Sequence, residues 1–157
     1  SVDLIHSVGV LHHTPDTKRT FDILCPILRP EGTFYVWLYS YEPWVTPTVN
    51  GLRKVTTRIP PDQFARVAEV MALPFQGFCN LVNTLGVRSY PPMERREAAL
   101  GLMDIFGAPY AHYHSFPEVA RWFRERGFDE VWECNNSRRG FGACGRRTSG
   151  SSASEPA

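Results

Sequence analysis

The chain has little excess charge, no long apolar run and no recognisable secretory signal pattern. Its formal net charge is only +1, which gives no electrostatic signature of a nucleic-acid or anionic-membrane partner. No apolar stretch reaches the roughly 18 residues that a membrane-spanning helix needs. We therefore expect a cytoplasmic protein that binds neither nucleic acid nor membrane.

Closely spaced cysteine pairs are also missing. The four cysteines lie far apart and form no C-x-x-C motif, which argues against a disulfide framework or a zinc site. This spacing predicts scattered reduced thiols at Cys25, Cys79, Cys134 and Cys144. With 43% hydrophobic and 21% charged residues, the 157-residue chain has the composition of one ordinary globular domain.

The first forty residues carry the pattern of a strand, a helix and a second strand. Residues 2–8 form a nearly continuous apolar run, typical of a parallel strand covered on both faces. An apolar stripe at helical spacing predicts a helix over 15–28, a stop at 29–32 and a strand over 33–40. This order indicates a βαβ unit in a parallel sheet.

Local signals set the expected bounds of that helix. Thr14 is the expected N-cap and Pro15 the first helical residue, with Asp16 at the positive end of the helix dipole. Pro26 lies inside the predicted helix and should kink it.

Residues 41–109 contain no convincing strand and have the pattern of a helical insertion or lid. A helix is expected to begin at Pro61, and prolines such as Pro74 punctuate the segment. The segment is too long for a simple connection within a compact sheet. We therefore expect a cap or lid here, between core segments 1–40 and 110–147.

The sheet pattern resumes near the C-terminus. Ser115 and Glu118 form a capping-box pattern that opens a helix, and Gly127 is a natural C-terminal stop. Strands follow over 128–135 and 141–147, and their short connection predicts an antiparallel pair.

The last strand contains a pattern that resembles a phosphate-binding loop. Residues 140–145 match G-x-G-x-x-G, but such a loop cradles phosphate only between a strand and a helix N-terminus. No helix can start in the following sequence, so we interpret these glycines as packing and turn positions. The small, polar residues 148–157 predict a disordered tail.

The strings "VDLIHSVGVLHHTPDTKRTFDILCPILRPEGTFYVWLY", "YHSFPEVARWFRERGFDEVWEC" and "GFGACGRR" closely resemble class I S-adenosylmethionine-dependent methyltransferases of the small-molecule type (methyltransferase type 11/12-like). The resemblance implies the C-terminal half of a Rossmann-like, doubly wound α/β sheet with a final antiparallel pair. It also implies that the glycine-rich cofactor loop and the ribose-binding acidic residue lie upstream. We accordingly expect a fragment that by itself binds S-adenosylmethionine weakly or not at all.

The resemblance places the first strand end beside the cofactor. Ligands of open α/β sheets bind at the carboxyl ends of strands. Ser7, Val8 and Gly9 are therefore the predicted cofactor-binding residues, with Gly9 allowing close approach of a ligand. The alternative is a tight strand exit without a ligand.

Four histidines are the candidate catalytic residues. His12 and His13 follow the first strand, and a neutral imidazole suits a base that removes an acceptor proton. His112 and His114 precede the C-terminal helix, and alternation places them on one side of an extended segment. If that helix begins at the same sheet edge, the two histidine groups lie near each other. The alternative roles are capping and stacking.

Aromatic residues surround these positions and are the predicted acceptor-binding residues: Tyr39, Tyr41, Tyr110 and Tyr113. They would suit a flat or apolar small-molecule acceptor, but docking of the helical insertion is the favoured role of Tyr39 and Tyr41, and stacking is the alternative role of Tyr110 and Tyr113.

Two other classes of function remain open. The four histidines could bind zinc or iron in a metal-dependent hydrolase, but adjacent histidines rarely share one ion and no carboxylate stands at ligand spacing. The chain could also be a non-catalytic interaction module. Because the expected sheet lacks strands, we also expect marginal stability and self-association through an exposed edge.

Overall fold

A computed structural model describes residues 1–86, 93–137 and 139–147, so the expected tail at 148–157 lies outside the described residues. The chain divides into two compact units. One consists of Ser1–Pro43 and Tyr110–Ala157, and the other consists of Trp44–Pro109.

The N-terminal part of the first unit is a βαβ unit, as the sequence predicts. Strand β1 (Val2–Val8) and strand β2 (Leu28–Tyr39) pair in parallel. Helix α1 (Thr17–Leu24) connects them, preceded by the 3-10 turn η1 (Leu11–His13) and followed by the turn η2 (Cys25–Ile27).

Both ends of α1 differ from the prediction. The N-cap is Asp16 rather than Thr14, because the Asp16 carboxylate accepts a hydrogen bond from Arg19 N at 2.9 Å. The Thr14 hydroxyl is used elsewhere and donates to Leu11 O at 2.7 Å. At the other end, the helix gives way to a 3-10 turn around Pro26 instead of kinking.

Strand β2 begins earlier than predicted. Residues 29–32, expected to form a stop, lie inside β2, where the pairing with β1 shifts between Val2 and Leu4. Glu31 adopts a positive φ of 64° within this irregularity. The turn-like residues therefore produce a bulge in a strand rather than its boundary.

The C-terminal part completes a mixed four-stranded sheet. Helix α5 (Phe116–Glu125) begins with the predicted capping box, and Gly127 follows it with a φ of 72°. Strands β3 (Glu130–Asn136) and β4 (Gly140–Arg146) pair antiparallel, as predicted. The sheet order is β1-β2-β4-β3, so the unit has an α/β fold with one parallel pair and a final antiparallel pair.

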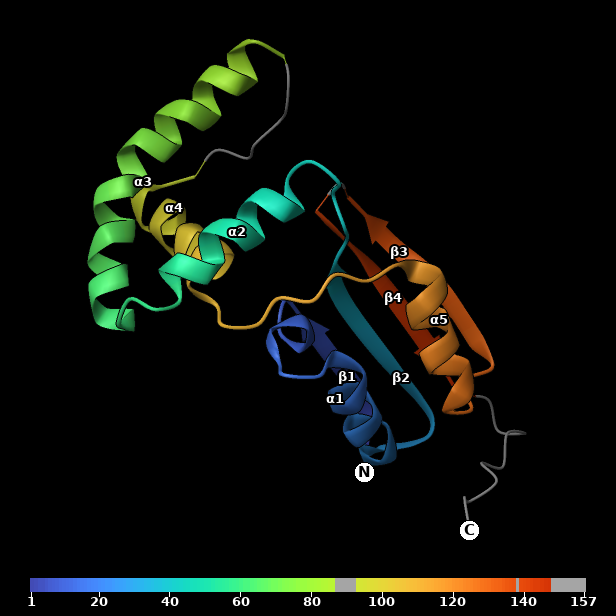
Figure 1. Cartoon of the computed structure of the whole chain (residues 1–157). Helices are drawn as coiled ribbons and strands as arrows, with labels where there is room; N and C mark the ends of the chain where they lie inside the picture. The colour runs from blue at the N-terminus through green and yellow to red at the C-terminus, as the bar shows by residue number, and fades with distance from the viewer. Residues whose placement is uncertain (87–92, 138, 148–157) are drawn as a thin grey trace. The chain divides into compact units, whose positions relative to one another are not determined.

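Helices α1 and α5 cover the same face of this sheet (Figure 1). Phe21 of α1 stacks on Phe34 of β2 at 4.9 Å between ring centroids, and Phe123 of α5 meets Phe21 edge-on at 4.8 Å. Val36, Leu38 and Phe141 extend this core along β2 and β4 and are almost completely buried.

Strand β1 is an edge strand in the described structure, and side chains on one of its faces are exposed, so the prediction of a strand covered on both faces is wrong. Its one neighbour is β2, and Leu4 and Val8 are 57% and 50% exposed. A continuous apolar run indicates that a strand can be buried, but it does not supply the neighbours that bury it.

The described part of the second unit is helical, as predicted. It contains α2 (Thr46–Thr56), α3 (Pro61–Thr84) and α4 (Arg95–Leu102), followed by the π-helical turn η3 (Met103–Gly107). Helix α3 begins at Pro61 as expected but continues through Pro74 instead of ending there.

The core of the helical unit is made of small side chains. Ala72 of α3 packs with Ala98 and Ala99 of α4, and Phe75 and Met93 lie against this cluster. Within the described residues, no helix is both long enough and apolar enough to cross a membrane.

Candidate functional site

The candidate site lies at the carboxyl ends of β1 and β2. After β1, Gly9 adopts a φ of 71°, and its amide donates a long hydrogen bond of 3.4 Å to Trp37 O on β2. The chain then forms η1, which contains His12 and His13. The positive φ is the physical reason for a glycine at this exit.

The segment before α5 reaches the same edge. His114 forms a parallel bridge with Ser40, and its amide donates to Tyr39 O at 2.9 Å. Two residues earlier, the His112 amide donates to His12 O at 2.9 Å. The structure thus brings together the two histidine groups, which are separated by about a hundred residues in the sequence.

The side chain of His13 also links the η1 segment to the segment before α5. His13 Nδ1 lies 2.8 Å from the main-chain oxygen of Tyr110. A carbonyl oxygen only accepts, so Nδ1 carries the proton in this hydrogen bond.

One set of rings stacks around His12, whose side chain is fully buried. The His12 ring centroid lies 4.0 Å from that of Tyr39 and 4.3 Å from that of His13. Tyr113 stacks on Tyr39 at 6.1 Å and meets Tyr41 edge-on at 6.4 Å. Three of the predicted tyrosines therefore form one aromatic cluster with the first histidine pair.

A second set of rings is built around His114. The ring centroids of His112 and His114 are 6.4 Å apart, as expected for residues on one side of an extended segment. Tyr110 stacks parallel to His112 at 6.5 Å, and Trp122 of α5 meets His114 edge-on at 4.9 Å.

The environment of His114 differs from that of an exposed histidine. Its Nδ1 lies 3.2 Å from a carboxylate oxygen of Glu118, one helical turn further on, and its side chain is 11% exposed. Burial lowers the pKa of His114 below its ordinary value, although the Glu118 carboxylate acts in the opposite direction. The ring is therefore neutral at neutral pH.

The Nε2 atoms of His112 and His114 are both buried. Within the described residues, neither His112 Nε2 nor His114 Nε2 has a hydrogen-bond partner. Buried polar atoms are usually satisfied, so these two nitrogens mark a place where a ligand could donate or accept a hydrogen bond.

The three predicted cofactor residues occupy different environments on β1 and its exit. Ser7 is almost buried and pairs with Val36, whereas Val8 is half exposed and pairs with Trp37. A side chain added at Gly9 would meet nothing within 4 Å, so open space lies next to this residue. Contact of these residues with a cofactor stays a prediction.

Sequence reasoning identified the histidines and tyrosines but missed Glu118 and Trp122 as parts of this site. Glu118 was explained as the N3 residue of a capping box, a role that the structure confirms. The available signal was its spacing of four residues from His114, which brings two side chains together on a helical turn.

The G-x-G-x-x-G pattern is used for packing, as predicted. A Cβ at Gly142 would lie 2.7 Å from the Tyr35 hydroxyl, and one at Gly140 would lie 2.6 Å from the Trp37 ring. On the opposite face, a Cβ at Gly145 would overlap the Phe123 ring. These glycines allow large rings to lie flat across β4, which explains the pattern without a phosphate.

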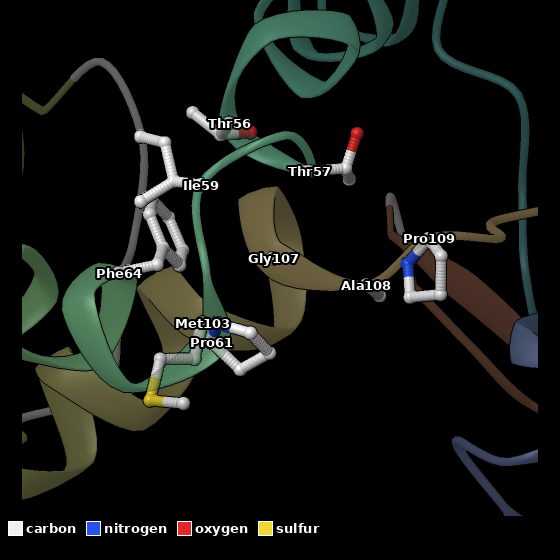
Figure 2. Close-up of a pocket in the computed structure, with 9 residues that line it drawn as sticks. All are labelled: Thr56, Thr57, Ile59, Pro61, Phe64, Met103, Gly107, Ala108 and Pro109. Atoms are coloured by element: carbon white, nitrogen blue, oxygen red, sulfur yellow. The ribbon is translucent and has the colours of Figure 1, made fainter.

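A separate pocket of about 400 Å³ lies within the helical unit (Figure 2). Its polar side chains serve the fold, because Thr56 donates a hydrogen bond to Phe106 O in η3 and Thr57 donates one to Arg53 O in α2. The lining contains none of the residues predicted from the sequence and consists of Thr56, Thr57, Ile59, Pro61, Phe64, Met103, Gly107, Ala108 and Pro109.

The described residues provide no ligand set for the metal-dependent alternative. No three His, Cys, Asp or Glu side chains among them are placed to share a metal ion. None of the four cysteines forms a disulfide, and burial raises the pKa of Cys25 to about 12 and that of Cys144 to about 11.

No protein-family model matches this chain, and no curated protein matches it. Among solved structures, an O-methyltransferase family protein from Burkholderia thailandensis matches with 14% identity and a TM-score of 0.46, covering 94% of this chain and 31% of that one. A protein described as a possible exported protein from Bordetella parapertussis matches with 13% identity and a TM-score of 0.49, covering 95% of this chain and 40% of that one. The chain thus spans less than half of either structure, and these similarities are too low to assign it to a family.

Proposed function

We propose that the chain forms part of an enzyme that transfers a methyl group from S-adenosylmethionine to a small-molecule acceptor. The observation that carries this proposal is the meeting of two histidine segments at one sheet edge, through the hydrogen bond from His112 N to His12 O. Ligands of α/β sheets bind at this kind of edge, and the sequence resemblance to class I methyltransferases points to the same place.

The strand exit after β1 fits a bound cofactor. Gly9 has open space where a side chain would be, and Val8 is half exposed beside it. We propose that the main chain of Val8 and Gly9 contacts S-adenosylmethionine, while the nearly buried Ser7 supports them from within the sheet. When bound, this cofactor supplies an electrophilic methyl group on a sulfonium.

The aromatic cluster of Tyr39, Tyr113 and Tyr41 is the proposed acceptor wall. Methyl transfer needs an aligned acceptor more than it needs covalent help from the protein, and stacked rings hold a flat molecule in one orientation. The histidines at the same edge then supply hydrogen bonds and, where the acceptor must lose a proton, a base.

Titration calorimetry with S-adenosylmethionine tests this proposal, using protein expressed from the complete coding sequence. We expect Gly9→Ala to weaken binding by at least roughly tenfold, or about 1.4 kcal/mol, because a methyl group enters the proposed ligand space. Gly86→Ala is the matched control, since Gly86 also has a positive φ and open space around it but lies in the helical unit.

Equal effects of the two substitutions would place the cofactor elsewhere. Absence of any binding would overturn the proposed activity and would favour the alternative of a non-catalytic interaction module. We keep a cytoplasmic location as part of the proposal, supported by four cysteines that form no disulfide.

A further inference from the structure

The contact between His114 and Glu118 fixes more than the position of one ring. Glu118 Oε2 accepts a hydrogen bond of 3.4 Å from the Ser115 amide, while Oε1 lies 3.2 Å from His114 Nδ1. Both oxygens of the carboxylate are therefore used, and the capping box holds it in place. Because a carboxylate only accepts, the neutral His114 ring carries its proton on Nδ1 and a lone pair on Nε2.

The rest of the ring is also held. The His114 amide donates a hydrogen bond to Tyr39 O, and the residue forms a β-bridge with Ser40. Trp122 packs edge-on against the His114 imidazole. The charged and titratable groups that act on the ring are Glu118, which raises its pKa, and His112, which lowers it, while burial has the largest effect and lowers it. A neutral, oriented imidazole results.

The lone pair on His114 Nε2 is buried and, within the described residues, receives no hydrogen bond. His112 Nε2 is in the same condition, and the two rings are 6.4 Å apart. The Glu118 contact satisfies Nδ1 of His114 but leaves its Nε2 without a partner among the described residues. Because this nitrogen carries a lone pair, a ligand that satisfies it carries a polar hydrogen.

We propose that His114 is the base that accepts the proton of a hydroxyl group on the methyl acceptor, and that Glu118 is the positioning residue that fixes the tautomer of His114. This inference rests on the proposed methyl transfer and names its substrate class. The acceptor carries an ionisable O–H, as a phenol does, and stacks on the neighbouring tyrosines.

The hydroxyl proton passes to His114 Nε2, and the acceptor oxygen forms its bond to the methyl carbon of the sulfonium donor. The carbon–sulfur bond breaks, and its electron pair stays on sulfur. The positive charge of the donor is thereby replaced by that of the imidazolium, next to the Glu118 carboxylate, and the proton then leaves to solvent.

Nitrogen-15 NMR of the histidine-labelled protein tests the positioning role. We expect the Nδ1–H tautomer for His114 in the unmodified protein. Glu118→Gln keeps a residue suited to the N3 capping position but removes the negative charge, so the pKa of His114 should fall. Glu118→Asp should restore part of the shift, and Glu125→Gln on the same helix, whose carboxylate pairs with Lys18, should leave the pKa unchanged.

A pair of probe ligands separates a base from a structural histidine. 4-Nitrophenol has a proton to give, whereas 4-nitroanisole has the same ring without that proton. At a pH below the pKa of free 4-nitrophenol, we expect the bound molecule to be the phenolate and His114 to be protonated. The phenolate absorbance should be lost in the variants Glu118→Gln and His114→Gln. 4-Nitroanisole should bind without changing the protonation of His114.

The inference is overturned if neither probe binds, if both probes perturb His114 equally, or if His114 carries its proton on Nε2. These outcomes are independent of cofactor binding. Binding of S-adenosylmethionine with a failed probe experiment would leave methyl transfer in place and remove His114 as its base, whereas failed cofactor binding would remove the proposed function itself.

Discussion

At the scale of single residues, three glycines of β4 show how a functional pattern can have a packing cause. Gly140 and Gly142 allow the rings of Trp37 and Tyr35 to lie across the strand, and Gly145 does the same for Phe123. The spacing of the glycines follows from the alternation of the strand and from the size of the rings. No phosphate is needed to explain it.

We predict that Gly145→Ala destabilises the protein by about 1–3 kcal/mol, because the added methyl group overlaps the buried Phe123 ring. Urea unfolding measures the change in the free energy of unfolding. Gly77→Ala in α3 is the control, because its methyl group has open space and should stabilise the helix by up to about 1 kcal/mol. An unchanged midpoint for Gly145→Ala would contradict the packing interpretation.

Glu118 shows what sequence reasoning leaves out at this scale. The capping box accounted for this residue completely, so no unexplained property called for a second role. Only the folded structure shows that one oxygen of its carboxylate remains for His114. The histidines and tyrosines were predictable because strand ends and alternation place them, whereas a side chain with two partners was not.

At the scale of secondary structure elements, the predicted bounds were correct where residues within the element set them. They were wrong where a contact with another segment of the chain sets them. The bounds of β1 and the start of α5 follow from patterns within a few residues. The start of β2 depends on β1, since pairing between Leu28 and Val2 draws turn-like residues into the strand. The cap of α1 similarly depends on which of two neighbouring side chains reaches the free amides.

Ion pairs join the two helices that cover the sheet. Asp22 of α1 accepts a hydrogen bond of 2.8 Å from Arg126, which follows α5, and contacts Lys18 at 3.0 Å. Lys18 in turn contacts Glu125 of α5 at 3.1 Å. The hydrogen bond from Arg126 holds the pKa of Asp22 below its usual value, although partial burial acts in the opposite direction.

We predict that Asp22→Asn lowers the free energy of unfolding by about 1–2 kcal/mol at neutral pH. Because the pKa of Asp22 is lowered by folding, its contribution is present above the pKa of the unfolded chain, near 3.8, and is lost as the pH falls through the folded value. Chemical unfolding at several pH values should therefore show the difference shrinking only in strong acid.

The control for this prediction is Asp3→Asn. Asp3 pairs with Arg29, but both side chains are more than half exposed, so we expect no measurable change. Equal losses in the two variants would contradict a specific role for the pairs between α1 and α5.

At the scale of the whole molecule, the exposed edge of β1 governs the behaviour that we expect in solution. Leu4 of β1 is 57% exposed and Val8 is 50% exposed. In the described structure, β1 pairs with β2 on one side and has its other edge unpaired. A long apolar edge strand is a template for pairing with another chain. The marginal stability and self-association expected from the sequence stay predictions, now with a defined strand.

Sedimentation analysis over a range of concentrations checks this. We predict that the 157-residue chain self-associates as its concentration rises, and that Leu4→Lys shifts it towards the monomer because a charge opposes edge pairing. Leu52→Lys on α2 is the control, since Leu52 is similarly exposed, at 51%, but lies outside the sheet. A monomer at every concentration would overturn the prediction.

The sheet order has a consequence for how this chain is made. Strand β4 lies between β2 and β3, so β3 joins the sheet only through the strand that follows it in the sequence. During synthesis, β1 and β2 can pair as soon as both have left the ribosome, whereas β3 must wait until residues 140–146 follow it. Loss of β4 by premature termination would therefore detach β3 from the sheet and leave the β1–β2 pair in place.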